Sequence, residues 1–502
     1  MKKLFDFVKK YRLAFLIVLA VVARFLFLGL RPFDGDEGII IKIAQSSNFK
    51  AMIANVVNDV HPPLFHALEY IVLHIFRLSE FSARFLPAIC GILAIWPIYL
   101  VIKKLSDQKV AFWVSLLSIF SSVLAYHSAE VRPYALFTLI FFWQFYLFLQ
   151  IQEKRSLFVC FSFLVSCFFL ILTQYIGLFV LAGELLYLVC ANRKACTLKN
   201  ISAGLIAVLL FVSFWGKTFL HQLSGRSFEQ SQAIDLEANL IGIFNAIYRF
   251  GAGRLFLDLD LSIQKNLEFA RVQPLQFTIF TLSLIVPLIL LIWGIIAVFK
   301  NNRKAFWLNV LTVLPIFVAA LVSNEIGPRS ARYLSFLAPF YLFFVAYPFF
   351  KSKNSIFYIL YSIFLVIFLS AFINSLYFER TKSGVNKIAE YLSANAAPED
   401  YILVQGGFGG GEELVLHYYL ANGAQNKKIF DLYGDYQVGN LATIKSRDPL
   451  EYIARLKKES PAVWFYDLTY SFDKNSLIGY KYSEIDLGQD KEEKNLIVYK
   501  VE

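Results

Sequence analysis

The sequence predicts a helical protein that crosses a membrane many times and ends in a small α/β domain. The chain of 502 residues is 58% hydrophobic and has a mean hydropathy of +0.57, which is too apolar for a soluble globule of this length. Apolar runs of about 20 residues recur along residues 1–376, and such runs match the thickness of a bilayer. From residue 377 the composition becomes polar, with short strand-like and helix-like segments.

Charge separates the same two parts. Residues 377–502 contain 15 Lys and Arg against 19 Asp and Glu, a net charge of −4. Because the whole chain has 48 and 37, residues 1–376 hold 33 and 18, a net charge of +15. We attribute this excess to loops that orient the protein in the membrane, and therefore expect no nucleic-acid partner.

About eleven transmembrane helices are expected. They fall near residues 13–30, 82–102, 110–125, 133–150, 156–172, 175–191, 200–219, 274–299, 305–323, 332–350 and 355–376. The basic clusters between them lie at residues 103–109, 154–155, 193–199, 300–304 and 351–353. With a cytoplasmic N-terminus, every one of these clusters falls on the cytoplasmic side, as the distribution of Lys and Arg in membrane proteins requires.

This topology depends on residues 62–76 not crossing the membrane. The segment is apolar but short, begins with Pro62-Pro63, and carries His66 and Glu69. These features favour a helix that lies along the interface. The external loops are then residues 31–81, 126–132, 222–273 and 324–331, and the tail from residue 377 is extracytoplasmic.

The predicted domains are a transmembrane catalytic domain over residues 1–376 and an α/β domain over residues 377–502. Strands are expected at residues 401–404, 462–466 and 495–499, and helices at 384–394 and 449–458. A glycine-rich stretch at residues 406–411 lacks the Lys-Ser/Thr of a phosphate-binding loop and is interpreted as a turn. The five cysteines show no C-x-x-C spacing, so we expect neither a disulfide framework nor a thiolate metal site.

Ionisable residues gather in the external loops. The first loop contains Asp34, Asp36, Glu37 and His61; the second contains His127, Glu130 and Arg132; Arg332 and Tyr333 follow the last short external loop. A carboxylate at the membrane surface can act as a general base. Arginine can grip a phosphate through its planar fork, with histidine in support. The combination suits displacement of a phosphate leaving group from a sugar carbon.

Structural roles remain open for the same residues. Asp34 and Glu37 could cap the helix that follows them, and His61 could mark a turn before Pro62. Glu130 and Arg132 could pair with each other. Arg84 and Arg332 could anchor helices at the interface with their charged ends in water. Glu184, inside a predicted span, could have either a functional role or a buried, hydrogen-bonded structural role.

An ordered set of short motifs resembles the GT-C superfamily of integral-membrane glycosyltransferases. The motifs are Asp36-Glu37, His61-Pro62-Pro63, Ser82-Ala83-Arg84-Phe85-Leu86-Pro87, Glu130-x-Arg132-Pro133-Tyr134-Ala135 and Arg332-Tyr333-Leu334. The branch with the protein O-mannosyltransferases and the lipid A aminoarabinose transferases is the most similar one. The resemblance covers about residues 1–350, and no single motif in it is specific.

The resemblance implies an inverting glycosyltransferase. Its donor would be a polyprenyl-phosphate-linked sugar, and its acceptor a lipid, glycan or protein on the extracytoplasmic side. Asp36 matches the catalytic base, with Asp34 in reserve, and Glu37 and Glu130 complete the catalytic acids. The donor phosphate would lie near His61, Arg132, Arg332 and Tyr333, with Arg84 and His127 as further candidates.

Some relatives bind a divalent metal, so a metal is a possible cofactor. The expected location is the inner, or plasma, membrane, in contact with membrane lipid. Two other classes compete with the enzyme: a transporter or flippase of lipid-linked sugars, and a membrane scaffold with an external binding domain. A flippase would have ionisable residues at mid-membrane depth and repeated span patterns, whereas a scaffold would leave the external acids without a purpose.

Overall fold

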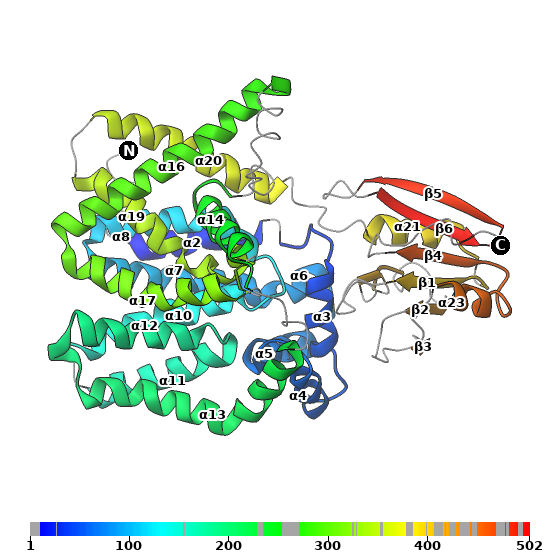
Figure 1. Ribbon diagram of the computed structural model, residues 1–502, viewed down its shortest axis with the longest axis horizontal. Helices are drawn as coiled ribbons and strands as arrows, with labels where there is room; N and C mark the ends of the chain where they lie inside the picture. Colours follow the sequence, from blue (N-terminus) through cyan, green and yellow to red (C-terminus); the bar gives the residue numbers. More distant parts are fainter. Residues whose placement is uncertain are drawn as a thin grey trace. The chain divides into compact units, whose positions relative to one another are not determined.

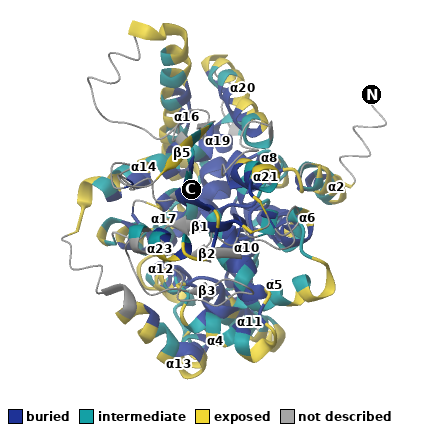
Figure 2. Ribbon diagram, turned by 90° about the vertical axis from the view of Figure 1, so that its right-hand side faces the viewer, coloured by how far each residue is buried: buried dark blue, intermediate teal, exposed yellow. Residues whose placement is uncertain are grey.

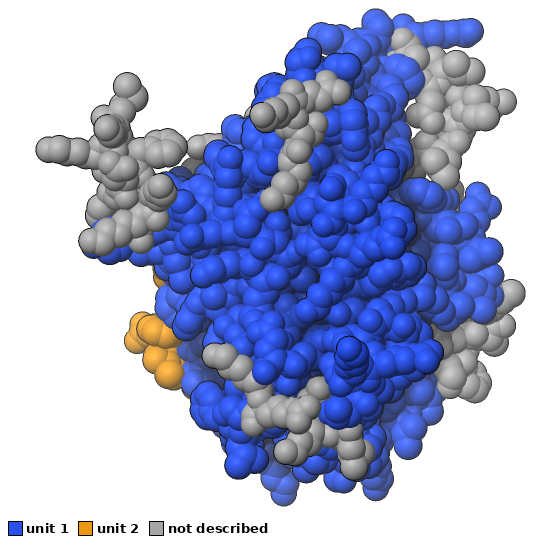
Figure 3. All heavy atoms as spheres, turned by 90° about the vertical axis from the view of Figure 1, so that its left-hand side faces the viewer, with its two compact units in different colours: residues 1–28, 47–72, 84–378 blue, residues 29–46, 73–83, 379–502 orange. Residues whose placement is uncertain are grey.

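The computed structural model describes most of the chain and divides it into two compact units (Figure 3). The helical unit comprises residues 1–28, 47–72 and 84–378, and the sheet unit comprises residues 29–46, 73–83 and 379–502. The described residues are 11–501 without 27, 154–155, 228–233, 254–270, 324–325, 328, 352–354, 378–384, 398, 406–414, 417, 421–427, 432–441, 444–448, 468–476, 478–480 and 490–494. The glycine-rich stretch at 406–411 lies outside them.

The helical unit is built from α-helices and two short 3-10 helices (Figure 1). They are α2 (Arg12–Phe25), α4 (Phe49–Val57), α5 (Pro63–Ile75), α7 (Phe85–Leu105), α8 (Gln108–Ile119), α9 (Ser122–His127), α10 (Tyr134–Ile151), α11 (Leu157–Thr173), α12 (Gly177–Cys190), η1 (Arg193–Ala195), α13 (Leu198–Ser227), α14 (Leu236–Ala252), α16 (Pro274–Asn301), α17 (Arg303–Val322), α18 (Ser330–Tyr333), η2 (Ser335–Leu337), α19 (Ala338–Lys351) and α20 (Ser355–Tyr377).

The protein is a multi-pass membrane protein, as predicted. In the part of the chain that the structure describes, six helices are long and apolar enough to cross a membrane, in α7, α10, α13, α16, α17 and α20. Five shorter apolar helices accompany them, and α5, with 13 residues, is one of these. Since α8 and α12 are equally short, length alone does not separate α5 from a span. The total of eleven spans and the interfacial position of α5 stay predictions.

Burial follows the pattern of a bilayer-embedded bundle (Figure 2). Apolar side chains on α13 and α16, such as Leu209 and Ile292, are about half exposed. Such outward apolar faces suit contact with lipid tails, because exposure of apolar surface is unfavourable in water but not in the bilayer interior. The core of the helical unit is aromatic. Phe141 of α10, for example, packs edge-on against Phe336 and Phe340, with ring centroids 4.7 and 5.8 Å away.

Two expectations about helix boundaries were wrong. The predicted span 110–125 is broken into α8 and α9, because Phe120 ends one helix and the Ser121 hydroxyl accepts a hydrogen bond from the Leu124 amide at the start of the next. The predicted external loop 222–273 contains α14, whose inner face is buried against the bundle. Its apolar residues recur with helical spacing, which the sequence analysis overlooked.

The sheet unit contains α3 (Gly35–Ala44), α6 (Glu80–Ala83), α21 (Val385–Asn395), α23 (Pro449–Leu456) and six strands. The strands are β1 (Tyr401–Gln405), β2 (Lys428–Asp431), β3 (Ala442–Thr443), β4 (Val463–Asp467), β5 (Tyr482–Gln489) and β6 (Asn495–Val501). They form one sheet in the order β3-β2-β1-β4-β6-β5. β3, β2, β1 and β4 run parallel to one another. β6 pairs antiparallel with β4, and β5 pairs antiparallel with β6.

Side-chain alternation in the central strands gives the sheet two covered faces. Leu403 of β1 and Phe465 of β4 belong to a core cluster with Ile453 of α23. On the other face, Trp464 of β4 packs against Tyr391 of α21 with ring centroids 6.1 Å apart. A central strand buried on both faces is typical of parallel sheets. The three strands and two helices predicted from the sequence are confirmed, and β2, β3 and β5 were missed.

Candidate active site

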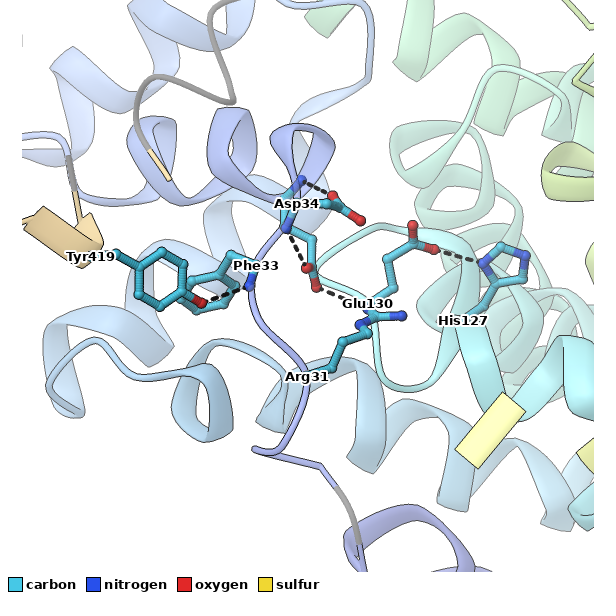
Figure 4. A network of polar contacts seen from close by, with 7 residues as sticks. Arg31, Phe33, Asp34, His127, Glu130 and Tyr419 are labelled. Carbon is cyan, nitrogen blue, oxygen red and sulfur yellow. Dashed lines mark hydrogen bonds and ion pairs between the residues drawn. The ribbon is translucent and has the colours of Figure 1, made fainter. Parts of the chain in front are cut away.

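The first-loop acids begin helix α3. The Asp34 carboxylate accepts a hydrogen bond from the Glu37 amide at 2.9 Å, and the Glu37 carboxylate accepts one from the Asp34 amide at 3.2 Å (Figure 4). This reciprocal pair is a capping box, which satisfies two amides that the first turn would leave unpaired. The capping role that the sequence left open for Asp34 and Glu37 is confirmed. Asp36 lies on the same turn, is partly buried, and is not a member of the capping box.

Glu37 is tied further into the loop. Its side chain is fully buried, and the Arg31 guanidinium lies 3.4 Å from its Oε1. Burial of a carboxylate without a cation is costly, so Arg31 balances this charge. Both oxygens of Glu37 therefore interact with the loop that carries it, which favours Asp36 over Glu37 as the group that reacts.

Residues of the C-terminal part of the chain contact this loop within the sheet unit. The Phe33 amide donates a hydrogen bond to the Tyr419 hydroxyl at 2.8 Å, and that hydroxyl donates to Glu80 at 2.9 Å. The Phe33 ring packs edge-on against Tyr418, with centroids 5.3 Å apart. The sequence analysis missed these partners, because 386 residues separate Phe33 from Tyr419 and no local pattern connects them.

The loop between α9 and α10 contains a buried, hydrogen-bonded pair of side chains. His127 ends α9, and its Nδ1 lies 2.8 Å from Oε2 of Glu130 (Figure 4). The two residues are 5% and 1% exposed. Gly91 of α7 allows this loop to pack closely, since a Cβ at Gly91 would lie 2.1 Å from Oγ of the adjacent Ser128. His127, a reserve candidate, is thus the partner of Glu130 that the geometry identifies.

Tyr134 at the start of α10 connects the second loop with the last one. Its ring lies 4.6 Å from the His127 ring and 6.2 Å from the Tyr333 ring, measured between centroids. The Arg132 guanidinium lies 6.0 Å from the Tyr134 centroid, and the charge of Arg332 also acts on the Tyr134 phenol. The predicted proximity of these two loops is therefore found within the helical unit. Arg132 is mostly buried, whereas Arg332 is partly exposed.

His61 lies in a turn organised by Asp59. The Asp59 carboxylate accepts a hydrogen bond from the His61 amide at 3.3 Å and lies 3.2 Å from Nε2 of His66. Burial raises the pKa of Asp59, but the contact with His66 and the charges of His61 and His66 outweigh it and hold the pKa well below its usual range. His61 is 5% exposed. The turn interpretation and a donor-binding role for its ring are compatible, since the turn uses only the backbone amide.

Arg84 and Glu184 illustrate two structural outcomes. Arg84 is fully buried where α7 begins, so the alternative that its charged end reaches water at the interface is not supported. Glu184 of α12 accepts a hydrogen bond from Gln144 of α10 at 2.9 Å, in the interior of the helical unit. Gln144 also lies 3.5 Å from the Cys167 thiol of α11. Gln144 therefore links α10 to both α11 and α12, and the bond to it supports a structural role for Glu184.

Two sets of residues thus form within the two units. The helical unit brings together His127, Glu130, Arg132, Tyr134 and Tyr333, and the sheet unit carries Asp34, Asp36 and Glu37. That Asp36 meets Glu130 at one cavity stays a prediction.

All five cysteines are free thiols. Among the described residues, no group of three or more His, Cys, Asp or Glu side chains could hold a metal ion.

Comparison with known proteins agrees with this architecture. Residues 60–216 match the family model described as dolichyl-phosphate-mannose-protein mannosyltransferase. No curated protein matches the chain. Among solved structures, the oligosaccharyltransferase of Archaeoglobus fulgidus, in complex with Zn and sulfate, has a TM-score of 0.51 at 15% identity. The match covers 81% of this chain and 61% of the archaeal protein, so the chain spans less than two thirds of that protein's length.

A second solved structure has similar dimensions. ArnT from Cupriavidus metallidurans, bound to undecaprenyl phosphate, aligns over 97% of both chains at 13% identity, with a TM-score of 0.49. The expected fold is confirmed by the likeness to the archaeal enzyme, and the expected class by the family match that spans the second external loop. The chain therefore shares its fold with the archaeal oligosaccharyltransferase, and its residues 60–216 match the dolichyl-phosphate-mannose-protein mannosyltransferase family.

Proposed function

We propose that this protein transfers a sugar from a polyprenyl-phosphate-linked donor to a lipid, glycan or protein acceptor on the extracytoplasmic side, with inversion at the sugar carbon. The observation that carries the proposal is the match of residues 60–216 to a family named for a polyprenyl-phosphate sugar donor. This segment contains His61, Glu130 and Arg132. The buried pair of His127 and Glu130, beside two arginines, supports an arrangement made for a charged ligand.

Asp36 is the proposed general base. Asp34 and Glu37 stabilise the first turn of α3 through the capping box. Asp36, which lies between them, is not part of the capping box and is therefore the acid assigned to catalysis. Asp36 takes the proton of the acceptor hydroxyl or amine. The acceptor atom then attacks the anomeric carbon from the side opposite the phosphate. The bond from this carbon to the phosphate oxygen breaks with its electron pair, which releases polyprenyl phosphate.

The arginines and His61 are the proposed donor-phosphate ligands. Arg132 and Arg332 both act on Tyr134, so both contribute positive charge in the surroundings of its phenol. Their positive charge would stabilise the phosphate as it leaves, because charge develops there in the transition state. Tyr333 would add a hydroxyl, and Glu130, held by His127, would set the position of this wall. Arg84, being buried, would act only through the packing of α7.

The experiment that tests the proposal uses the purified full-length protein in nanodiscs with a radiolabelled polyprenyl-phosphate sugar. Transfer of label to an added acceptor, or slow hydrolysis of the donor, supports the enzyme. Movement of intact donor between leaflets would instead indicate a flippase, and neither result would indicate a scaffold; both outcomes contradict the proposal. A divalent metal stays a possible cofactor, and the same assay with and without a chelator decides whether a metal takes part.

The proposed location is the inner, or plasma, membrane, with the tail from residue 377 outside the cytoplasm. The positive loops support this orientation. Fusion of alkaline phosphatase to the C-terminus should give an active reporter, because that enzyme requires an oxidising compartment for its disulfides. An inactive phosphatase fusion, together with a fluorescent cytosolic reporter at the same place, would reverse the topology.

A further inference from the structure

The helical unit has a cavity of about 230 Å³ that the proposed reaction does not use. Three lysines line it: Lys104 in the last turn of α7, Lys194 in η1, and Lys304 in the first turn of α17. They belong to three different connecting segments, so the tertiary structure, not local sequence, brings them together. Lys194 and Lys304 are exposed and Lys104 is partly buried.

The cavity is far from the proposed active site. Its wall includes Leu149 and Gln152 at the end of α10, whereas Glu130 and Arg132 precede the start of the same helix. The 18 residues of α10 span roughly 27 Å at 1.5 Å per residue. The distribution of basic loops predicts that this end of the bundle faces the cytoplasm.

The lining keeps a positive excess. Glu153 is the acidic residue of the lining, and its carboxylate lies 2.5 Å from the Lys104 ammonium. Three lysines against one glutamate leave a formal charge of +2. The side-chain amides of Asn192 and Asn302 already donate hydrogen bonds within the lining. Asn192 donates to Gln152 at 2.8 Å, and Asn302 donates to the Leu105 carbonyl at 2.6 Å. The lysines therefore supply the charge with which the cavity would attract a ligand.

Orientation of the protein in the membrane does not by itself require this geometry. Lysines that only set topology need to face water, and they have no reason to share a cavity. Leu105, Leu149 and Leu308 add apolar wall next to the lysines. Charge beside apolar surface at the end of a membrane helix fits a ligand that is anionic at one end and apolar at the other.

We propose that this lysine cavity binds the phosphate group of an anionic phospholipid from the cytoplasmic leaflet. The ammonium groups of Lys104, Lys194 and Lys304 surround the phosphate as point charges, while the leucines contact the glycerol and the first carbons of the chains. A soluble phosphate compound offers the same phosphate chemistry without the apolar part, and the experiment separates these two sources.

The test measures binding of dioctanoyl phosphatidylglycerol to the full-length protein by native mass spectrometry, with dioctanoyl phosphatidylcholine as the neutral reference. The triple variant Lys104→Gln, Lys194→Gln, Lys304→Gln should lose about tenfold or more in affinity for phosphatidylglycerol, at a contribution near 1 kcal/mol per lysine. The neutral lipid should be unaffected.

A matched control removes the same charge nearby. The variant Lys103→Gln, Lys300→Gln, Arg303→Gln changes residues of the same basic clusters that do not line the cavity, and it should change the affinity less than about threefold. Equal losses in both triple variants would overturn the proposal in favour of general surface charge. Should the first triple variant fail to accumulate, Lys194→Gln and Lys304→Gln, both at exposed positions, should each still weaken binding severalfold.

Inorganic phosphate identifies the source of the ligand. It should displace the phospholipid only at a concentration far above that of the lipid, because it lacks the contacts with Leu149 and Leu308. Binding of inorganic phosphate as tight as that of phosphatidylglycerol would overturn the lipid assignment. This result would leave the glycosyltransferase proposal untouched, since the two sites lie at opposite ends of α10.

Discussion

The first and second loops that the sequence predicts to be external both carry acids, but they stabilise those acids in different ways. In the first loop, Asp34 and Glu37 bind backbone amides of their own helix. In the second loop, Glu130 binds the side chain of His127 in a nearly fully buried pair. A capped helix fixes the direction of the backbone, whereas a buried, hydrogen-bonded pair fixes one side chain. The first loop is therefore suited to present Asp36, and the second to hold a rigid wall.

The largest expected effect separates the acids of the first loop. Asp36→Asn should lower the initial rate of sugar transfer by about 10²–10⁴-fold, because the general base is lost. Asp34→Asn should retain most of the activity, since asparagine caps a helix about as well as aspartate. Rates are measured with labelled donor on protein that elutes and unfolds like the wild type.

Two results would break this part of the comparison. Wild-type turnover in Asp36→Asn would remove Asp36 from the role of base. A loss in Asp34→Asn as large as that in Asp36→Asn would assign the reserve acid instead. Asp107→Asn, at the cap of α8, is the matched control for a change from carboxylate to amide, and it should leave the rate unchanged.

Substitutions in the second loop should lower the stability of the protein. Glu130→Gln leaves His127 without its charged partner in a buried site, and we expect the free energy of unfolding to fall by about 1–3 kcal/mol. The midpoint of thermal unfolding in detergent measures this change. The pair is tested by the double variant His127→Gln, Glu130→Gln, which should lose less than the sum of the two single variants. Additive losses would show that the two residues do not interact.

A smaller effect is expected where the tail holds the first loop. Tyr419→Phe removes the hydroxyl that accepts the Phe33 amide, at a cost of about 1 kcal/mol. If the tail positions the loop of Asp36, kcat should fall severalfold while KM for the donor stays the same. Tyr418→Phe is the control, because its hydroxyl contacts Glu80 at 3.3 Å while the Phe33 bond to Tyr419 remains. Equal kcat in both variants and the wild type would assign Tyr419 to stability alone.

The smallest effect concerns Asp59, the acid that precedes His61. Its pKa is lowered in the folded protein, so it contributes stability above its ordinary pKa of about 3.9 and loses that contribution as the pH falls below this value. The thermal midpoints of wild type and Asp59→Asn should therefore differ at pH 6 and converge towards pH 3. A difference that stays constant over this range would contradict the lowered pKa.

Local features of the sequence were sufficient for much of the fold. Long apolar runs predicted the membrane helices because backbone groups in lipid must be satisfied within a helix. The spacing of Asp34 and Glu37 indicated the start of α3, since a capping box acts over three residues. The break at Phe120 and helix α14 were not predicted, although the cap at Ser121 and the helical spacing of apolar residues in α14 are both local signals.

The candidate site divides in the same way. Asp36, Glu130 and Arg132 could be chosen from residue type and loop position. Tyr419, Tyr134 and Asp59 could not be chosen in this way, because their roles come from contacts with other segments or from a turn that the sequence showed only as His61-Pro62-Pro63. For Arg84 the residue type left an interfacial anchor and a site role open, and packing at the start of α7 buries its side chain.

The sequence by itself determined that the chain enters a membrane, which loops carry its charge, and which acids begin a helix. These properties follow from hydrophobicity and from hydrogen bonds over three or four residues, and both act locally. Only the tertiary structure decided that Tyr419 binds Phe33, that the pair of His127 and Glu130 is buried, and that Lys104, Lys194 and Lys304 line one cavity. Such contacts form when the packing of apolar surfaces brings distant segments together, and the spacing of residues along the chain does not encode that distance.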